Sequence, residues 1–337
     1  MGVGRVGRVV VYGAGAIGGV VGGRLAEHGH DVVLIARGEH GRALREGGLR
    51  LESPDEVVRL PLPCVERPSD LELAPDDVVV LAMKTQDTPA ALDALAEAVC
   101  AQALDRAPAV VCAQNGVENE RLALRRFPEV YAVCVMCPAT HLDPGVVQAG
   151  SAPVTGILDL GRYPSGADGQ APAIAELFES STFVSVARPD VMRWKYSKLL
   201  MNLGNVVQAA FPPSPEADEL ARRARHEGRT CLEAAGIDVA SAAEDRERRG
   251  DLLTLRPVAG QERSGGSTWQ SLARGAHRLE TDHLNGEIVL IGRSCGRPTP
   301  VNEALQRLGL RLVAEGVAPG GADLRTFLDE LDELDGP

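Results

Sequence analysis

Short apolar runs alternate with helix-like stretches from Arg8 to about Val186. The runs are rich in β-branched residues and predict strands at Val9–Tyr12, Asp31–Ala36, Val78–Ala82, Ala109–Ala113 and Val130–Met136. The stretches between them predict helices at Ala16–His28, Thr88–Ala101 and Val117–Arg126. Such alternation is typical of a parallel sheet with helices on both faces, in which ligands bind beyond the carboxyl ends of the strands.

The pattern changes in the second half of the chain. Residues Pro138–Pro164 are rich in Gly and Pro, which predicts a hairpin or irregular structure before a last strand near Phe183–Val186. From Pro189 onward the strand signal fades, and helices are predicted at Asp190–Ala210, Pro215–Ala235, Ser241–Leu253, Trp269–Cys295 and Thr299–Ala314. The acidic stretch Asp323–Pro337 predicts a solvated helix with a frayed tail.

These patterns predict an α/β fold in two domains, and 337 residues are enough for each domain to bury its own core. We expect a Rossmann-type, doubly wound parallel sheet over residues 1–187 and an all-α domain over residues 188–337. The core must be aliphatic, because aromatic residues make up only 3% of the chain.

Charge and cysteine content exclude several classes of protein. A net charge of −12 disfavours nucleic-acid partners, because binding to a phosphate backbone needs a basic surface. Glycines interrupt the first apolar stretch, so we expect neither a signal peptide nor a membrane partner. Seven cysteines, an odd number, favour reduced thiols and a cytoplasmic protein. A helical second domain is compatible with a homodimer, although no exposed heptad identifies an interface.

A glycine loop follows the first predicted strand. Gly13-Ala14-Gly15-Ala16-Ile17-Gly18 matches G-x-G-x-x-G, and helix-forming residues come after it. In that context the glycines turn tightly, approach a pyrophosphate and pack the helix on the strand. The free amides at the helix start, near Ala16 and Ile17, then face the phosphates. The alternative is a glycine-rich turn without a ligand.

The end of the second predicted strand indicates which dinucleotide binds. NAD-binding folds usually place Asp or Glu there for the ribose hydroxyls. Here the strand ends at Arg37, followed by Gly38, and a guanidinium binds a 2′-phosphate through two charge-assisted hydrogen bonds. NADP(H) is therefore the expected cofactor. A solvent-facing arginine is the alternative interpretation.

Lysine is rare, since only Lys84, Lys195 and Lys198 occur among 35 basic residues. Most positive charges of the chain are arginines, which do not release a proton near neutral pH. A lysine in such a chain therefore suggests chemistry in which the ammonium gives up its proton. Lys84 follows one predicted strand and Asn115 follows the next, which places both at the ligand-binding edge as cofactor contacts, with surface positions as the alternative.

The predicted helix around residue 198 carries a polar stripe. At 100° per residue, Asn202 and Asn205 each lie within about 40° of Lys198. A bound ketone and carboxylate would satisfy such a stripe, with Lys198 protonating the developing alkoxide and the amides holding the acid. A network that ties the two domains together is the alternative. Lys195 falls about 60° from Lys198 around the helix, and we interpret it as a structural surface residue.

A second polar cluster includes Thr268 and, twelve residues later, Glu280. A hydroxyl at a helix start is often a cap, and a carboxylate there is favoured by the helix dipole. Other polar groups carry less weight. Cys134 and Cys137 have redox spacing but would lie on opposite faces of a strand, so we expect them in the core. No His or Cys group has metal-ligand spacing, so no metal is expected.

With these motifs in place, the chain resembles the ketopantoate reductase (2-dehydropantoate 2-reductase) family over nearly its whole length. The matching pieces are Gly13–Gly18, Arg37-Gly38, Lys84, Gln114-Asn115-Gly116, Lys198 with Asn202, and Glu280-x-Asp282-x-x-Asn285-Gly286. The resemblance implies a C-terminal domain like that of 6-phosphogluconate dehydrogenase. It also implies NADPH-dependent reduction of a 2-oxo acid, ketopantoate, to the 2-hydroxy acid pantoate on the pathway to pantothenate.

The resemblance further implies roles for individual residues. Lys198 would be the general acid, Asn202 and Thr268 substrate contacts, and Glu280 a catalytic partner of a substrate hydroxyl or of the lysine. The family pattern has a second asparagine eight residues after the lysine, where this chain has Val206, so Asn205 is expected to replace it as a substrate contact. The chain also has Leu272 where the family often has aspartate.

Two other functions remain open on this sequence. One is a related NADP-dependent reductase that acts on a different keto acid or on an imine. The other is a non-catalytic NADP(H)-binding redox sensor, which would bind NADPH without consuming it.

Overall fold

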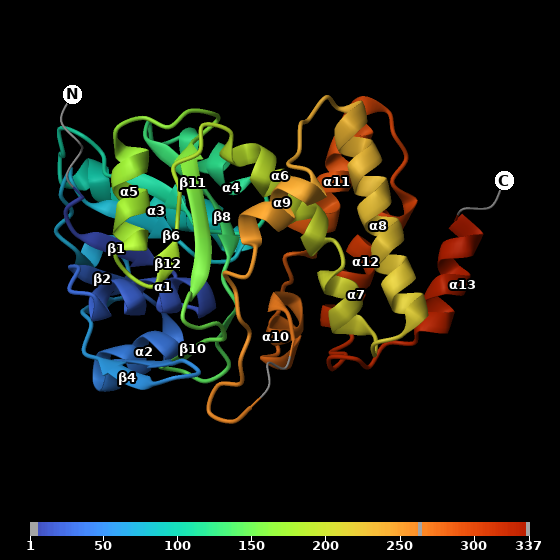
Figure 1. The fold of residues 1–337 in the computed structure, drawn as a ribbon, viewed down its shortest axis with the longest axis horizontal. Coiled ribbons are helices and arrows are strands. Elements are labelled where there is room, and N and C mark those ends of the chain that lie inside the picture. The colour runs from blue at the N-terminus through green and yellow to red at the C-terminus, as the bar shows by residue number, and fades with distance from the viewer. Residues whose placement is uncertain (1–5, 262–264, 335–337) are drawn as a thin grey trace. The chain divides into compact units, whose positions relative to one another are not determined.

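The computed structural model describes residues 6–261 and 265–334 (Figure 1). The chain divides into two compact units. The first unit comprises residues 1–195 and 241–263, and the second comprises residues 196–240 and 264–337. The division therefore falls eight residues after the expected boundary at residue 187. Residues 241–263, which were expected in the helical domain, belong to the first unit.

The first unit is built on an eight-stranded sheet in the order β12-β11-β8-β7-β6-β1-β2-β5. All neighbouring strands run parallel except β8 and β11, which are antiparallel. The strands are β1 (Val9–Tyr12), β2 (Val32–Ile35), β5 (Cys64–Val65), β6 (Val78–Leu81), β7 (Ala109–Cys112), β8 (Val130–Met136), β11 (Gly156–Arg162) and β12 (Phe183–Val184). This topology confirms the predicted parallel-dominated sheet and explains its continuous apolar strands.

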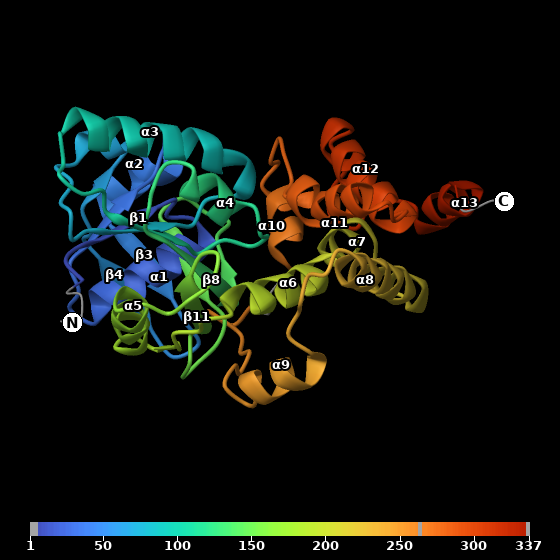
Figure 2. The same cartoon turned by 90° about the horizontal axis from the view of Figure 1, so that it is seen from above.

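Helices cover both faces of this sheet (Figure 2). In β1, Val9 and Val11 enter one hydrophobic core while Val10 and Tyr12 enter the other, as the alternation of side chains along a strand requires. One core is completed by α1 (Ala16–Glu27) and α5 (Gln170–Glu179), and the other by α3 (Thr88–Ala101) and α4 (Asn119–Leu124).

A second, four-stranded sheet in the order β4-β3-β10-β9 was not predicted. Its strands are β3 (Leu49–Glu52), β4 (Val57–Leu60), β9 (Ala139–Thr140) and β10 (Val146–Ala149), and α2 (Gly38–Gly47) precedes β3. β3 pairs with β4 as a hairpin and with the distant β10 in parallel. The Gly- and Pro-rich segment therefore does form the expected hairpin, but the hairpin joins a separate sheet.

Helix α1 lies between the two sheets, and its glycines permit close contact on both sides. A Cβ added at Gly22 would lie 2.9 Å from Leu34 of the main sheet. A Cβ at Gly19 would lie 2.6 Å from Val147 of the small sheet, and one at Gly23 would lie 3.0 Å from Leu49. Glycines on neighbouring faces of the helix thus stand where larger side chains would hold the helix away from the two sheets.

Segment 241–263 is held to the first unit by a buried carboxylate. Asp159 of β11 accepts two hydrogen bonds from Arg248 of α9 (Ala242–Arg249), at 2.6 and 2.8 Å, and another from Arg188 at 2.8 Å. Asp159 is buried, and two guanidinium groups satisfy its charge.

The second unit is helical, as predicted. Helix α6 (Val191–Asn202) carries the chain into it, and the remaining helices are α7 (Asn205–Ala210), α8 (Pro215–Ala234), α10 (Ser267–Ala273), α11 (Thr281–Cys295), α12 (Pro300–Ala314) and α13 (Leu324–Leu334). Helices α8, α11 and α12 pack against one another, and α13 packs on α12 (Figure 1).

Two helices predicted as continuous are interrupted. The stretch Asp190–Ala210 breaks at residues 203–204, and Trp269–Cys295 breaks at residues 274–280. The first break exposes the Leu203 carbonyl, which accepts a hydrogen bond from the Asn285 amide of α11 at 3.1 Å. Asn285 in turn donates to Asn302 of α12 at 3.0 Å. Both amides are buried, so this tertiary contact satisfies a carbonyl that a helix end leaves without a partner.

The packing of α1 against the small sheet predicts the effect of a single methyl group. Gly19→Ala is expected to lower the free energy of unfolding by about 1–3 kcal/mol, because the new Cβ overlaps Val147. Urea unfolding measures this. Gly169→Ala is the control, since Gly169 has φ of −61° and its Cβ would meet nothing within 4 Å. Equal stability of the two variants would contradict the contact between α1 and β10.

Candidate functional site

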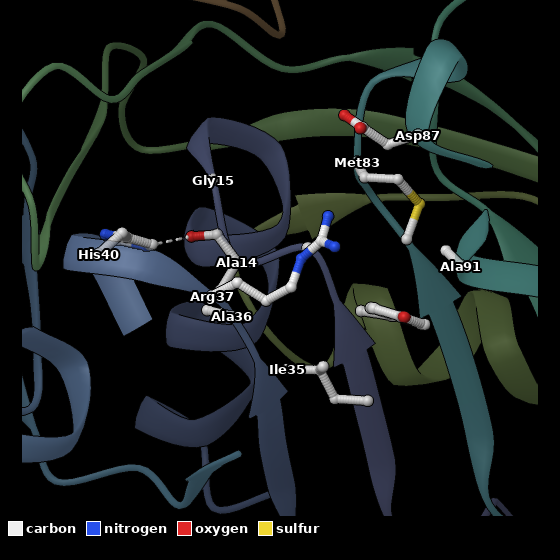
Figure 3. A pocket seen from close by; sticks show the side chains of 11 residues that line it. Ala14, Gly15, Ile35, Ala36, Arg37, His40, Met83, Asp87 and Ala91 are labelled. Carbon is white, nitrogen blue, oxygen red and sulfur yellow. Dashed lines mark hydrogen bonds between the residues drawn. The ribbon is translucent and has the colours of Figure 1, made fainter. Parts of the chain in front are cut away.

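A pocket of about 240 Å³ opens in the first unit where β1, β2 and β6 end (Figure 3). The glycine loop, the end of β2 and the start of α3 contribute its lining residues, which are Tyr12, Gly13, Ala14, Gly15, Ile35, Ala36, Arg37, His40, Met83, Asp87 and Ala91. The pocket therefore lies at the predicted carboxyl-end edge of the sheet.

The glycine loop has the geometry that a dinucleotide requires. Gly13 adopts φ of +97°, and a Cβ there would lie 2.7 Å from the Met83 amide nitrogen. A Cβ at Gly18 would lie 2.1 Å from the Gly13 carbonyl oxygen, so Gly18 lets α1 start directly against the loop. A Cβ at Gly15 would meet no protein atom within 4 Å and would occupy open space where Gly15 lines the pocket. These residues fit a pyrophosphate held against the start of α1 at Ala16 and Ile17.

Arg37 lies two residues after the end of β2 and immediately before α2. Its side chain points into the pocket between Ala14 and Met83 (Figure 3). On the wall of the same pocket, burial raises the pKa of the Tyr12 hydroxyl, and the nearby positive charge of Arg37 partly opposes that rise. The Tyr12 phenol therefore stays neutral, and Arg37 supplies the positive charge of this site.

Sequence reasoning missed several residues of the pocket, notably His40, Met83 and Asp87. The His40 ring lies 2.8 Å from the Ala14 carbonyl oxygen and accepts a hydrogen bond from the Gly145 amide at 2.9 Å. A histidine three residues after Arg37 has no distinguishing pattern along the chain, because its partners are backbone groups of distant segments.

The loops that carry Lys84 and Asn115 are joined by buried polar side chains. Gln114 donates hydrogen bonds to the Met83 carbonyl at 2.9 Å and to Thr88 at 2.8 Å. Asn119 donates to the Asn115 carbonyl at 3.0 Å. Thr88 also donates to Asn119 at 2.8 Å, which closes the network. The structure thus brings the two predicted loops together, although neither Lys84 nor Asn115 lines the pocket described above.

The interpretation of Lys195 as a surface residue was wrong. Its side chain is 3% exposed, and its ammonium lies 2.5 Å from the carboxylate of Glu120, which is fully buried. The ammonium also donates to the Gln114 carbonyl at 2.9 Å. Burial raises the pKa of Glu120, while Lys195 lowers it. Lys195 therefore anchors α6 both to α4, through Glu120, and to the β7–α4 loop, through the Gln114 carbonyl.

The break after Asn202 changes the geometry of the predicted polar stripe. Lys198 is half-buried and Asn202 is buried on α6, one helical turn apart. Asn205 begins α7 beyond the break, so the helical angle that grouped it with Lys198 does not apply. Val206 is 1% exposed, whereas Asn205 is half-buried, so the polar residue is the more accessible of the two.

The remaining candidates also lie in the second unit. Thr268 is buried in the first turn of α10, which packs on α7. Glu280 is buried and immediately precedes α11, where its charge faces the positive end of that helix. The candidate catalytic and substrate residues are therefore all in the second unit, and the candidate cofactor residues are all in the first.

Three further observations concern metal-ligand groups, membrane-spanning helices and the two closely spaced cysteines. No group of three or more His, Cys, Asp or Glu among them is placed to hold a metal ion. No helix in the described ranges is both long and apolar enough to cross a membrane. Cys134 is buried in β8 and Cys137 follows it half-buried, both as free thiols.

The glycine loop, its pocket and the parallel sheet define a dinucleotide-binding protein with a separate helical unit. The model of the family "Ketopantoate reductase PanE/ApbA" matches residues 9–164, and the C-terminal model of that family matches residues 190–311. The chain belongs to the ketopantoate reductase family. It is thus an oxidoreductase of the class that acts on CH–OH groups, with a nicotinamide dinucleotide as cofactor, as predicted.

Curated relatives and solved structures agree with this assignment. The chain is 29% identical over 313 residues to 2-dehydropantoate 2-reductase of Halobacterium salinarum, covering 89% of this chain and 97% of that one. It is 29% identical over 314 residues to the enzyme of the same name from Archaeoglobus fulgidus, covering 90% and 97%.

A crystal structure of a PanE/ApbA family ketopantoate reductase from Ralstonia eutropha JMP134 is similar with a TM-score of 0.73 at 29% identity, covering 91% of this chain and 98% of that one. A ternary structure of D-mandelate dehydrogenase with NADH and anilino(oxo)acetate shares the fold, with a TM-score of 0.75 at 22% identity, covering 92% and 99%.

The buried Lys195–Glu120 pair predicts a pH-dependent loss of stability. In Lys195→Met the carboxyl of Glu120 keeps its burial but loses the ammonium, so its pKa rises further. A raised carboxyl pKa in the folded state costs stability at high pH, and the cost disappears as the pH falls toward the unfolded value near 4.5. We expect a loss of about 3–5 kcal/mol at pH 8 and a smaller loss at pH 5.

Urea unfolding at both pH values measures the effect. The double variant Lys195→Met/Glu120→Gln is the matched control, because it has no buried carboxyl to ionise. Parallel pH profiles of the single and double variants would show that Glu120 is not the group responsible.

Proposed function

We propose that this protein reduces ketopantoate to pantoate with NADPH. The observation that carries the cofactor assignment is the Arg37 guanidinium, which points into the glycine-loop pocket at the end of β2. A 2′-phosphate accepts paired, charge-assisted hydrogen bonds from such a group, whereas a carboxylate at this position would repel it. Gly13, Gly15 and Gly18, with the amides of Ala16 and Ile17, receive the pyrophosphate, and Lys84 and Asn115 contact the rest of the dinucleotide.

The proton for the reduction comes from Lys198 in this proposal. When bound, the nicotinamide supplies the hydride to the keto carbon. The Lys198 ammonium donates a proton to the carbonyl oxygen as negative charge develops there, which a guanidinium does poorly because it does not release its proton near neutral pH. The retention of lysine in a chain that otherwise uses arginine supports this role.

Buried polar residues of the second unit bind the substrate in this proposal. Asn202, Thr268 and Glu280 are each buried polar residues of this unit. We assign the amide of Asn202 to the substrate carboxylate, assisted by Asn205 in place of the buried Val206, and Thr268 to a further substrate contact. Glu280 accepts the substrate hydroxyl or stabilises the ammonium of Lys198.

Removal of the proposed acid predicts a specific kinetic defect. Lys198→Ala is expected to lower kcat for ketopantoate by about 10²–10⁴ while NADPH binding is unchanged, since Lys198 is not among the residues that line the dinucleotide pocket. Nicotinamide absorbance measures turnover, and fluorescence titration measures binding. Lys198→Arg keeps the charge without a transferable proton and should be equally inactive. Full activity of Lys198→Arg would exclude proton donation.

The same assay separates ketopantoate from other substrates. The analogue 3,3-dimethyl-2-oxobutanoate lacks only the hydroxyl of ketopantoate. A site that hydrogen-bonds this hydroxyl should favour ketopantoate by about 10⁴ in kcat/KM. Equal rates would indicate a reductase for another 2-oxo acid, and NADPH binding without turnover of any 2-oxo acid would indicate a redox sensor.

Arg37 predicts the preference between the two dinucleotides. Arg37→Asp is expected to raise the KM for NADPH by about 10–100-fold and to lower that for NADH, because the 2′-phosphate loses its cation and the ribose hydroxyls gain an acceptor. Arg42→Asp is the control, since Arg42 is exposed on the same helix but does not line the pocket. A similar loss in both variants would point to the overall charge of α2 rather than to Arg37.

A further inference from the structure

His40 contacts the glycine loop, and the function proposed above assigns it no role. It lies in the first turn of α2, and each of its ring nitrogens bonds to the backbone of a different segment. Nε2 lies 2.8 Å from the carbonyl oxygen of Ala14, and Nδ1 accepts a hydrogen bond from the amide of Gly145 at 2.9 Å. The ring thus joins the glycine loop to the turn between β9 and β10.

These two bonds fix the protonation state of the ring. A carbonyl only accepts, so Nε2 must carry a hydrogen, and a backbone amide only donates, so Nδ1 must offer a lone pair. The imidazolium form would place a second N–H against the amide of Gly145. The position of His40 in the first turn of α2 disfavours the cation as well, because the helix dipole is positive there. The bonds therefore require the neutral Nε2–H tautomer.

The bond to Ala14 also fixes the direction of the next amide. In a trans peptide the carbonyl of one residue and the N–H of the following residue point to opposite sides. The Ala14 carbonyl points toward His40 (Figure 3). The Gly15 amide must therefore point away from His40, and Gly15 lines the pocket.

The other end of the bridge rests on a well-fixed turn. Gly145 adopts φ of +80°, and a Cβ there would lie 3.1 Å from the Cβ of Ala43 on α2. Its carbonyl accepts a hydrogen bond from the Arg50 amide of β3 at 2.9 Å. His40 therefore links the Ala14 carbonyl of the glycine loop to a turn that is itself fixed by packing and hydrogen bonding.

We propose that His40 is a positioning residue of the dinucleotide site, in which its neutral ring holds the Ala14–Gly15 peptide so that the Gly15 amide faces the pyrophosphate. This inference rests on the proposed binding of NADPH and adds a dependence on protonation. Protonation of His40 removes the acceptor for Gly145, releases the bridge and weakens dinucleotide binding.

Several charged or titratable groups lie beside His40, line its pocket or are close to it along the chain. His141, at the end of β9, has its ring centroid 4.2 Å from that of His40. Arg37 and Asp87 line the same pocket, from the end of β2 and the start of α3. Glu39 precedes His40 on α2, and Asp143 precedes Gly145 in the turn. Arg37 and a protonated His141 oppose a positive charge on His40, while the exposed Asp87 favours one.

The test compares NADPH dissociation constants, measured by fluorescence titration, for wild type, His40→Phe and His40→Gln. Phenylalanine keeps the ring but loses both bonds, so binding should weaken about tenfold at pH 8. Glutamine retains a donor for the Ala14 carbonyl and should restore part of the affinity. At saturating NADPH, kcat should stay within about twofold of wild type, because His40 orients a binding amide and transfers no proton.

His141→Phe is the matched control. This ring packs beside His40 but bonds to the Val146 carbonyl, within its own hairpin. Thermal unfolding of all variants measures structural damage separately. If His40→Phe and His141→Phe lose similar stability and both bind NADPH as tightly as wild type, His40 is structural only and the proposal fails.

The pH dependence gives a second readout. The ratio of the dissociation constant of His40→Phe to that of wild type cancels the titration of the ligand phosphates, which both proteins share. This ratio should fall toward 1 as the pH is lowered from 8 to 6. A rising ratio would overturn the proposal, because it would mean that the ring acts as a cation for the phosphates.

Failure of the proposed function gives a different pattern. Wild-type protein that binds NADPH but does not reduce ketopantoate leaves the dissociation constants of the His40 variants fully interpretable. Wild-type protein that binds no NADPH would overturn both.

Discussion

The position of α1 between two sheets is the constraint on which the cofactor site depends. The helix begins directly after the glycine loop, so wherever packing places its first turn, the phosphate-binding amides are placed as well. Contact with both sheets allows little freedom, because Gly22 approaches Leu34 on one side and Gly19 approaches Val147 on the other. The placement of the pocket is therefore a result of core packing.

The main sheet and the glycine-loop side of the pocket were predictable from sequence because the relevant information is local. Strands buried on both faces show continuous apolar runs, and a strand followed by Gly13-x-Gly15 and a helix is typical of a dinucleotide-binding loop. The small sheet was not predictable in the same way. Its strand β3 alternates Leu49 and Leu51 with the exposed Arg50, and it pairs with β10 nearly 100 residues away. Short strands of that kind gain their stability from partners that the local sequence does not reveal.

The second unit shows a different limit of sequence reasoning. Lys198 and Asn202 were identified correctly as neighbours on one helix, but the end of that helix is set by the Asn285 amide, which satisfies the Leu203 carbonyl from another helix. A helical wheel also describes only the axis of its own helix. It carries no information on α4, whose Glu120 forms a buried ion pair with Lys195. The rarity of lysine drew attention to Lys195, but it did not distinguish a residue that transfers a proton from one that forms a buried ion pair.

The return of residues 241–263 to the first unit has a consequence for the order in which this chain matures on the ribosome. The chain passes from one unit to the other after residues 195, 240 and 263. The first unit is therefore built from two separate segments of the sequence. Its buried Asp159 can pair with Arg188 soon after both are synthesised. Its other partner, Arg248, is synthesised 89 residues after Asp159. The nascent dinucleotide-binding unit is therefore complete only after part of the helical unit has emerged, and a single cut near residue 188 would separate it from one of its own ion-pair partners.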